Sequence, residues 1–323
     1  MNGFKPVGVI AIASVFALSA NVQAGGNYPS RPIKFILPSS AGGGGDMVGR
    51  LIGEGLSRRL GQPVVIDNNA GASGTIAIGQ LAKAPPDGYT IGLGTMTSTT
   101  LAPTVYPKLS YDPVKDLTTI AGIGTSPIVL LVRNDVPVKN LQEFLAYAKK
   151  SPEPLQYGSW GLGSTGHFCA EVLSQKAGIK LSHVPYKGSA PVMTAMLGGE
   201  IKAAWLDMAT GTAAVRSGKI RPVALCSRPT AAFPGVATYK EQGIDFDQWT
   251  GWAMFAPPNV PKPILDKLSN AVQQTIADPA VAAKLLDWGI TAEFIPGTQR
   301  NADNAKDIQT WRQIAQDAAM KFD

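Results

Sequence analysis

Short apolar runs alternate with amphipathic segments along most of the chain. The run at residues 33–37 ends at Pro38 and predicts a buried strand. Residues 46–60 repeat apolar side chains at intervals of three and four, with Arg50 and Glu54 on the other face, which predicts an amphipathic helix. Apolar strands separated by helices are typical of parallel sheets, so the pattern predicts an α/β fold. Further elements of this first series are a strand at 64–66, a helix at 74–83 and a strand at 89–94.

A second series follows a long extended segment at residues 120–132, which is broad enough to cross between two lobes. The segment 249–256 then predicts a strand that returns to the first lobe, and prolines at 261, 263 and 279 predict the first turns of C-terminal helices. We expect lobe one to comprise residues 25–124 and 227–323, and lobe two residues 125–226. The elements predicted in lobe two are helices at 141–150, 166–177, 190–197 and 212–216, and strands at 155–159, 181–186, 201–206 and 220–226.

The first 24 residues have the pattern of a secretory signal peptide. Lys5 gives a basic start, an apolar run extends from Val7 to Ala20, and Val22-Gln23-Ala24 forms a small-residue cleavage site. A transmembrane helix needs about 20 apolar residues, more than this run contains, so a permanent anchor is the weaker interpretation. We therefore expect residues 1–24 to be removed after Ala24, leaving a soluble, exported protein.

Composition narrows the classes of partner. A formal net charge of +6 is compatible with anionic ligands, but the basic residues are scattered rather than gathered in a stripe, which argues against nucleic acid. The hydrophobic fraction of 45% indicates a globular chain with a large core. The two cysteines, Cys169 and Cys226, could pair in an oxidising compartment, although two buried thiols are the interpretation that we favour.

A glycine-rich loop between a strand and a helix occurs in both lobes. In lobe one, residues 38–45, with four consecutive glycines, precede the helix at 46–60; in lobe two, residues 160–165 precede the helix at 166–177. Free backbone N–H groups at the positive end of a helix dipole favour an anion, and ligands of open α/β sheets bind beyond the carboxyl ends of the strands. The two loops predict a cleft that grips an acid from both sides. The alternative, that each loop is only a tight turn, stays open.

Signatures of an enzyme are scarce. Residues 161–166 satisfy G-x-G-x-x-G, but no carboxylate ends the next predicted strand, so we expect no nicotinamide and no other cofactor. The chain has two histidines, His167 and His183, too few for a typical histidine metal site, and we expect no metal. His167 either faces the cleft as a donor or caps its loop. A hydrolytic pair of Ser164 and His167 lacks an identifiable third member, which leaves a binding protein favoured and an exported hydrolase as the alternative.

Several blocks of sequence occur in an order that is typical of one family. They are Tyr28-Pro29-Ser30-Arg31-Pro32-Ile33, Ala41-Gly42-Gly43 with Asp46, Leu60-Gly61-Gln62-Pro63-Val64-Val65, residues 82–90, Tyr157-Gly158-Ser159 and residues 183–191. With these blocks the chain resembles Bug-type solute receptors, the periplasmic component of tripartite tricarboxylate transporters, over nearly all of its mature length. The resemblance implies a type II periplasmic-binding-protein fold, in which two α/β lobes joined by crossing strands close on a carboxylate. It also implies a periplasmic receptor that works with membrane transporter subunits, and we expect a monomer.

The resemblance and the two loops together define a set of expected ligand contacts. In the family, the loop after the first strand and its equivalent in the second lobe hold carboxylates, largely through backbone N–H groups and ordered waters. Asp207 matches an acidic position that often faces the cleft. The expected contacts are Ser39, Ser40, Ala41, Gly42, Gly43, Gly44, Asp46, Met96, Thr97, Trp160, Gly163, Ser164, Thr165, His167, Asp207 and Met208.

Departures from the family pattern bear on the choice of acid. Trp160 stands where a small residue usually follows Tyr-Gly-Ser, Asn69 stands where relatives usually carry arginine, and Met208 replaces the usual amide. Together with Met96 and Trp252, these residues could make the pocket more apolar than one for citrate, so we expect an apolar-bodied or aromatic mono- or dicarboxylate. The alternative is that the large side chains pack as core behind the loops. Transport and ligand presentation to a sensory partner are both compatible with the sequence.

Overall fold

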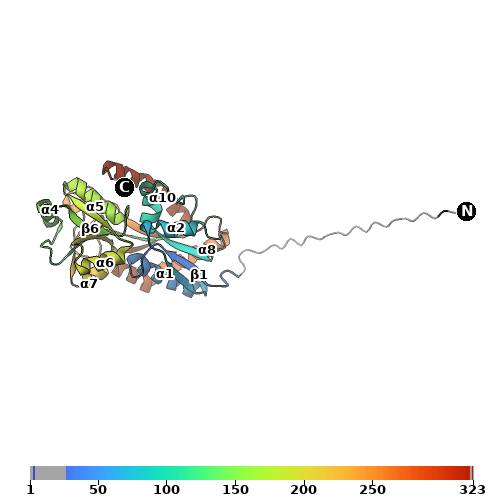
Figure 1. The fold of residues 1–323 in the computed structure, drawn as a ribbon. Coiled ribbons are helices and arrows are strands. Elements are labelled where there is room, and N and C mark those ends of the chain that lie inside the picture. The colour runs from blue at the N-terminus through green and yellow to red at the C-terminus, as the bar shows by residue number, and fades with distance from the viewer. Residues whose placement is uncertain (1–2, 4–26, 321, 323) are drawn as a thin grey trace.

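Two β-sheets, each covered by helices, form the two lobes of the molecule (Figure 1). The computed structural model describes residue 3, residues 27–320 and residue 322, so the expected signal peptide lies outside the described residues except for residue 3. The strand order is β11-β4-β10-β3-β1-β2 in lobe one and β7-β6-β8-β5-β9 in lobe two. The strands are β1 (Ile33–Leu37), β2 (Val64–Asn68), β3 (Thr90–Thr95), β4 (Thr118–Ser126), β5 (Ile128–Arg133), β6 (Leu155–Ser159), β7 (Leu181–Pro185), β8 (Ala203–Asp207), β9 (Ile220–Leu225), β10 (Thr250–Ala256) and β11 (Thr291–Pro296).

Both sheets are mixed, which corrects the expectation of parallel sheets. In lobe one, β1 runs parallel to β2 and β3, whereas β10 runs antiparallel to β3 and β4. In lobe two, β6 runs parallel to β7 and β8, whereas β5 runs antiparallel to β8 and β9. The antiparallel strands arise because the chain crosses between the sheets without a helix: β4 ends at Ser126 and β5 begins at Ile128 in the other sheet. The extended segment expected over residues 120–132 is thus two strands.

The helices follow the predicted order closely. Helix α1 begins two residues before the predicted start and ends at Leu60 as expected, where Gly61 adopts the left-handed conformation common at helix ends. The short helices between β3 and β4, which carry no apolar periodicity, were not predicted. The helices are α1 (Gly44–Leu60), α2 (Thr75–Ala82), α3 (Ala102–Val105), α4 (Leu141–Lys150), α5 (Thr165–Ala177), α6 (Ser189–Gly198), α7 (Met208–Arg216), α8 (Lys262–Ala277), α9 (Pro279–Asp287) and α10 (Gly297–Asp317), with the short turns η1 (Ala72–Gly74), η2 (Thr97–Leu101, a π-helix) and η3 (Lys240–Gln242).

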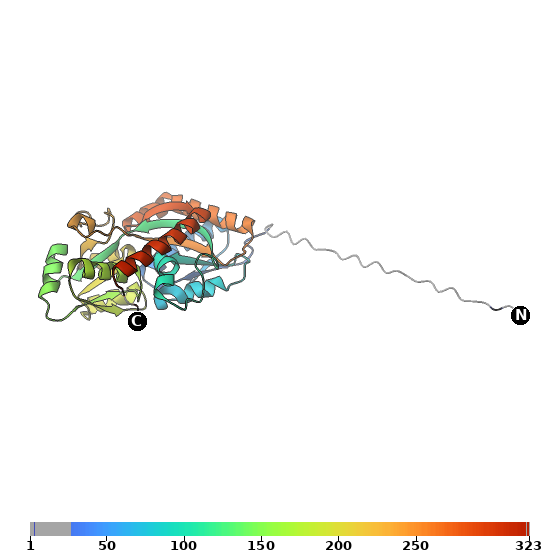
Figure 2. The same cartoon turned by 90° about the horizontal axis from the view of Figure 1, so that it is seen from above.

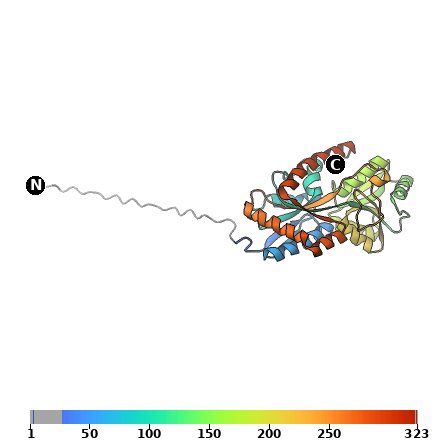
Figure 3. The ribbon, with the colours of Figure 1, turned by 180° about the vertical axis from the view of Figure 1, so that it is seen from behind.

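Helix α10 ties the two lobes together. It follows β11 of lobe one, and in its third turn the Nδ2 of Asn304 donates to the carbonyl of Thr99 at 3.0 Å. Toward its end Trp311 packs edge-on against Phe168 of lobe two, with ring centroids 5.3 Å apart. Figure 2 shows this helix in red, running diagonally over both lobes, and Figure 3 shows α8 beside α1 on lobe one.

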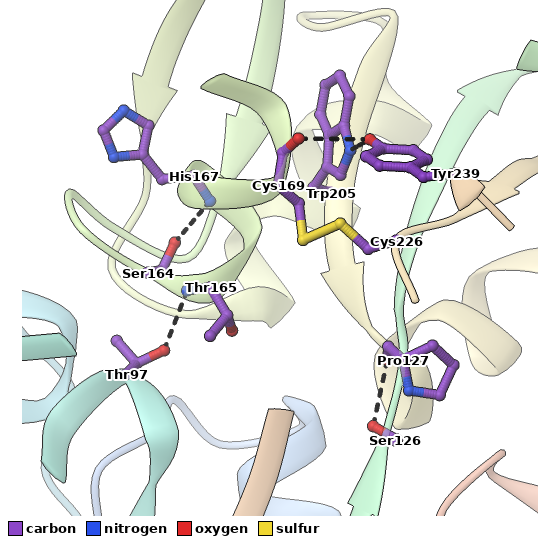
Figure 4. The surroundings of a disulfide bond; sticks show 10 residues. All are labelled: Thr97, Ser126, Pro127, Ser164, Thr165, His167, Cys169, Trp205, Cys226 and Tyr239. Carbon is purple, nitrogen blue, oxygen red and sulfur yellow. Dashed lines mark hydrogen bonds between the residues drawn. A yellow bond between two sulfur atoms is a disulfide. The ribbon is translucent and has the colours of Figure 1, made fainter. Parts of the chain in front are cut away.

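A disulfide bond joins Cys169 to Cys226 in lobe two (Figure 4). The interpretation of two buried thiols is therefore wrong. Cys169 lies in α5 and Cys226 follows β9, and the fold brings their Cα atoms to 6.2 Å, within the span of a disulfide. The sequence separation of 57 residues does not reveal this proximity. A loop of this length, closed in the unfolded chain, is typically worth about 2–4 kcal/mol of stability.

Candidate functional site

A cavity lies between the lobes, at the carboxyl ends of β1, β3 and β8. Its empty volume, counting the open mouth, is about 570 Å³, and its enclosed interior is about 50 Å³. The interior is narrow, and it suits a small molecule. Lobe one contributes the loops after β1 and β2, the start of η2 and parts of β3 and β10, and lobe two contributes the loops after β6 and β7 and the end of β8. The lining residues are Pro38, Ser39, Gly45, Ala70, Gly71, Ser73, Gly74, Thr95, Thr97, Trp160, Gly188, Ser189, Asp207, Thr250 and Trp252.

Four of the expected ligand contacts lie in the cavity wall: Ser39, Thr97, Trp160 and Asp207. Trp252, considered as an apolar wall, lies there too. The fold thus brings together residues that are far apart in the sequence and come from both lobes. The other expected contacts are outside the lining set: Ser40, Ala41, Gly42, Gly43, Gly44, Asp46, Met96, Gly163, Ser164, Thr165, His167 and Met208.

The loop after β1 offers hydrogen-bond donors to the cavity through Ser39 and Gly45. The Oγ of Ser39 is buried and has no hydrogen-bond partner among the described residues. The N–H of Gly45 belongs to the first turn of α1, where amides have no partner within the helix. This end of the helix also carries the positive part of its dipole. Of the predicted anion cradle of lobe one, Ser39 and Gly45 line the cavity, and the binding of an anion there stays a prediction.

Asp46 stabilises this loop from behind instead of facing the cavity. Its carboxylate accepts from the N–H of Gly42 at 2.9 Å and pairs with Arg50 at 2.9 Å. Although burial acts to raise it, the pKa of Asp46 is held below its ordinary value by hydrogen bonds from Arg50, Gly42 and Asn68. Asp46 is thus an ionised anchor of the loop, and its contact with a ligand stays a prediction.

The loop after β6 uses its polar groups within the protein. The N–H of Gly163 donates to Nδ1 of His167 at 3.0 Å, and the Oγ of Ser164 caps α5 by accepting from the N–H of His167 at 3.2 Å. The N–H of Thr165 donates to Oγ1 of Thr97 in lobe one at 3.2 Å. Trp160 is the residue of this loop that lines the cavity. Gly163, Ser164, Thr165 and His167 thus support the loop through internal hydrogen bonds, and His167 takes the capping role; their contact with a ligand stays a prediction.

Two methionines expected at the cavity pack in the core instead. Met96 is 4% exposed and Met208 fully buried, each within a hydrophobic cluster. Trp160 and Trp252 thus supply the large apolar surface of the wall. The alternative of core packing therefore holds for the methionines, whereas the tryptophans reach the cavity.

Asp207 is the one charged residue among the described residues that line the cavity, and none of them is Lys or Arg. Its Oδ1 caps α7 by accepting from the N–H of Thr210 at 2.9 Å, and its Oδ2 accepts from the hydroxyl of Ser189 at 2.6 Å. The carboxylate is thus held by its own lobe. An anionic ligand in this cavity would be bound by dipoles and hydroxyl groups, not by a cationic side chain.

Sequence reasoning connected the loop after β2 with the choice of acid through Asn69 but named none of its residues as a ligand contact. Ala70, Gly71, Ser73 and Gly74 all line the cavity. Ser73 has a φ of 53°, in the left-handed region that serine rarely adopts, and its Oγ donates to the carbonyl of Leu162 in lobe two at 2.6 Å. The signal was available, because this run of small residues also follows a strand of the parallel unit and so ends at the same edge of the sheet.

The lobes contact each other directly around the cavity. Besides the bonds of Thr165 and Ser73, the N–H of Gly44 donates to Oγ1 of Thr210 at 2.8 Å, and that hydroxyl donates to Oδ2 of Asp207 at 3.0 Å. Nε1 of Trp160 donates to Oγ1 of Thr97 at 3.3 Å. The cavity is thus bordered on several sides by hydrogen bonds between the lobes.

The two histidines stack on each other behind the loop after β6, with ring centroids 4.1 Å apart. Nε2 of His183 lies 2.7 Å from Oγ of Ser159, and the hydroxyl of Ser164 donates to the same oxygen at 3.0 Å. Burial lowers the pKa of His167 to about 3 and that of His183 to about 4. Both rings are neutral at neutral pH. The hydrolytic pair considered from the sequence is not assembled, because the Ser164 hydroxyl points to Ser159 and the His167 ring accepts from Gly163.

Two α/β lobes, crossing strands between them and a cavity at their junction define the class of two-lobed solute-binding proteins. Residues 48–320 match the family model described as the tripartite tricarboxylate transporter family receptor. The chain belongs to this family of solute-binding receptors, as its sequence blocks indicated. Its fold is that of periplasmic binding proteins: a structure described as a periplasmic transporter is 30% identical, with a TM-score of 0.88 over 92% of this chain and all of that one.

Relatives with full-length similarity agree with this assignment. A UPF0065 protein of Bordetella pertussis is 34% identical over 309 residues, which cover 94% of each protein. A protein of R. palustris solved with adipate is 30% identical, with a TM-score of 0.87 over 90% of this chain and 98% of that one. MatC of Rhodopseudomonas palustris, solved with bound malate, is 29% identical, with a TM-score of 0.83 over 89% of this chain and 99% of that one. Among the described residues, no helix has the length and apolarity that crossing a membrane requires.

The buried histidines predict that the protein loses stability in mild acid. The ordinary pKa near 6.5 applies in the unfolded chain, whereas burial lowers the values to about 3 for His167 and about 4 for His183 in the folded protein. Between these limits the unfolded chain binds more protons, so the stabilisation is complete above about pH 6.5 and decreases as the pH falls. At pH 5 the loss should be at most about 2 kcal/mol for each histidine. Urea unfolding at pH 7.5, 6 and 5 would measure it.

The matched variant for this experiment is His183→Gln, which keeps a hydrogen-bonding side chain beside Ser159 but does not titrate. Its unfolding free energy should depend less steeply on pH than that of the unaltered protein. Parallel pH profiles for the two proteins would contradict the assignment.

The approach of the lobes depends on the absence of a side chain at Gly44. A Cβ at this position would overlap Oδ1 of Asp207 in the opposite lobe. Gly44→Ala should therefore hold the lobes apart and give a larger radius of gyration in small-angle X-ray scattering. Alanine forms helices more readily than glycine, so weakening of α1 would not explain this result. Gly198→Ala is the control, because a Cβ there meets no atom within 4 Å. Equal radii for Gly44→Ala and the unaltered protein would rule out this contact as a determinant of closure.

Proposed function

We propose that this protein binds a small carboxylate in the cavity between its lobes and delivers it to the membrane subunits of a tripartite transporter. The observation that carries the proposal is the pair of donors at the positive end of α1. The buried Ser39 hydroxyl has no partner among the described residues, and Gly45, in the first turn of α1, lies beside Ser39 in the wall. A carboxylate is the small group that satisfies both donors and also suits the helix dipole. The relatives solved with adipate and malate support the same class of ligand.

The cavity favours an acid with few charges and an apolar body. Trp160 and Trp252 give it two aromatic surfaces, and its narrow interior leaves little room for a bulky hydrated anion. Asp207 places a negative charge in the wall, which disfavours an additional carboxylate nearby. We therefore propose a mono- or dicarboxylate, aliphatic or aromatic, in preference to citrate.

Binding without turnover is the activity that we propose. Ser164 and His167 lie outside the cavity lining, and their side chains bond to other groups, so the hydrolase alternative has no assembled nucleophile and base at the cavity. Both walls of the cavity come from one chain, which supports a receptor that acts as a monomer.

Calorimetry with a panel of acids tests the proposal. Benzoate, adipate and malate represent the proposed classes, and citrate represents the disfavoured one. We expect at least one of the first three to bind more tightly than citrate. Trp160→Ala should weaken the preferred acid about tenfold, because the lost aromatic contact is worth roughly 1.4 kcal/mol.

Leu286→Ala, on the exposed surface of α9, is the control and should leave the affinity unchanged. Failure of all carboxylates to bind would refute the receptor proposal. Tight citrate binding, or an unchanged affinity in Trp160→Ala, would refute only the specificity.

We further propose that the mature protein is periplasmic and begins at Gly25, after removal of residues 1–24. In this proposal lobe one comprises residues 25–124 and 227–323, and lobe two residues 125–226. Intact-mass spectrometry of the protein from a periplasmic extract should give the mass of a chain starting at or near Gly25. A mass that includes Met1 would overturn the proposed export.

A further inference from the structure

The hydroxyl of Thr97 sits at the junction of the two lobes and accepts two hydrogen bonds there. Thr97 opens the π-helix η2 of lobe one, lines the cavity and is 2% exposed. Its Oγ1 accepts from Nε1 of Trp160 at 3.3 Å and from the N–H of Thr165 at 3.2 Å, both in lobe two. Figure 4 shows the second of these bonds, between the start of α5 and the helical turn that carries Thr97.

These two bonds determine what the hydroxyl group can still do. A threonine hydroxyl has one hydrogen to donate and two lone pairs to accept with. Both lone pairs are engaged, by an indole N–H and a backbone N–H. The hydroxyl hydrogen is still able to donate, and no group among the described residues accepts it. A buried donor without a partner costs free energy, and the cavity is the space that the side chain borders.

We propose that Trp160 and Thr165 fix the Thr97 hydroxyl as a hydrogen-bond donor directed into the cavity, so that the site selects a carboxylate oxygen over the NH2 of the corresponding amide. The inference deepens the proposed carboxylate-binding function and rests on it. An acid offers this hydroxyl an acceptor. An amide group can offer its oxygen here, but its NH2 then lies in a wall that also contains the backbone of Gly45, whose N–H cannot accept a hydrogen bond.

The selectivity is coupled to the approach of the lobes. Thr97 belongs to lobe one, whereas both groups that donate to it belong to lobe two. With the lobes apart, neither lone pair of Thr97 is engaged by lobe two, and the hydroxyl accepts or donates equally well. With the lobes together, it can only donate. Trp160 is therefore a positioning residue that acts through Thr97, in addition to its aromatic contact with the ligand.

The variant that isolates this role is Trp160→Phe, which keeps an aromatic ring in the wall but removes the indole N–H. One lone pair of Thr97 is then free, and its hydroxyl can turn to accept from an NH2 group. The probes are benzoate with benzamide and adipate with adipamide, measured by calorimetry at pH 7.5. In the unaltered protein we expect the acid to bind at least about tenfold more tightly than the amide, the size of one unsatisfied buried hydrogen bond. In Trp160→Phe this ratio should fall about threefold or more.

Two further variants separate this role from a loss of packing. Thr97→Val removes the hydroxyl and should lower the acid-to-amide ratio as Trp160→Phe does, and the double variant should lower it no further than Thr97→Val alone. Trp252→Phe also removes an indole from the wall, but that indole N–H has no recorded partner among the described residues, so both affinities should change together and the ratio should persist.

The outcomes distinguish this inference from the proposed function. A Trp160→Phe ratio equal to that of the unaltered protein overturns the role of the indole N–H, even if carboxylates bind as proposed. Equal binding of acid and amide to the unaltered protein overturns the donor assignment of Thr97. Absence of binding by any acid overturns both this inference and the receptor function.

Discussion

Polar groups that are buried where two lobes meet have to find hydrogen-bond partners, and in this protein several find them in the opposite lobe. The amide of Gly44 bonds to Thr210, the amide of Thr165 to Thr97, and the hydroxyl of Ser73 to the carbonyl of Leu162. Each bond exists only when the lobes are together, and each lies beside the cavity. The shape of the site and the position of the lobes are therefore set by the same interactions.

A second consequence concerns charge. The cavity wall contains one carboxylate, Asp207, and no cationic side chain among its described residues. The carboxylate of Asp207 accepts hydrogen bonds from Thr210, which caps α7, and from Ser189 at the border of the site. An anion bound here would be stabilised by the end of α1 and by hydroxyl groups, which are oriented dipoles of moderate strength. Such binding discriminates by geometry and by the direction of each hydrogen bond, because no strong point charge dominates.

The sequence predicts the order of strands and helices well, since apolar periodicity reports which face of each element is buried. Helix α4 and strands β1 and β6 have the predicted limits. Strand direction in the sheets and the disulfide escaped prediction, because both depend on how distant segments meet. In the candidate site too, features set by the local sequence were predicted better than features set by tertiary packing. Ser39 and Asp207, at the ends of strands, were expected from topology and resemblance and lie in the cavity wall, whereas Met208, the residue after Asp207, packs in the core.

Helix α10 gives the cavity an external counterpart. Its first turns are held to lobe one through Asn304, and its later turns are held to lobe two through Trp311 and Phe168. Because α10 contacts both lobes, its contacts have to change when one lobe rotates relative to the other. Opening of the cleft would therefore move Trp311 relative to Phe168 of lobe two, or move α10 relative to lobe one. Opening and closing of the cleft would therefore be coupled to a displacement of α10 on the outside of the molecule.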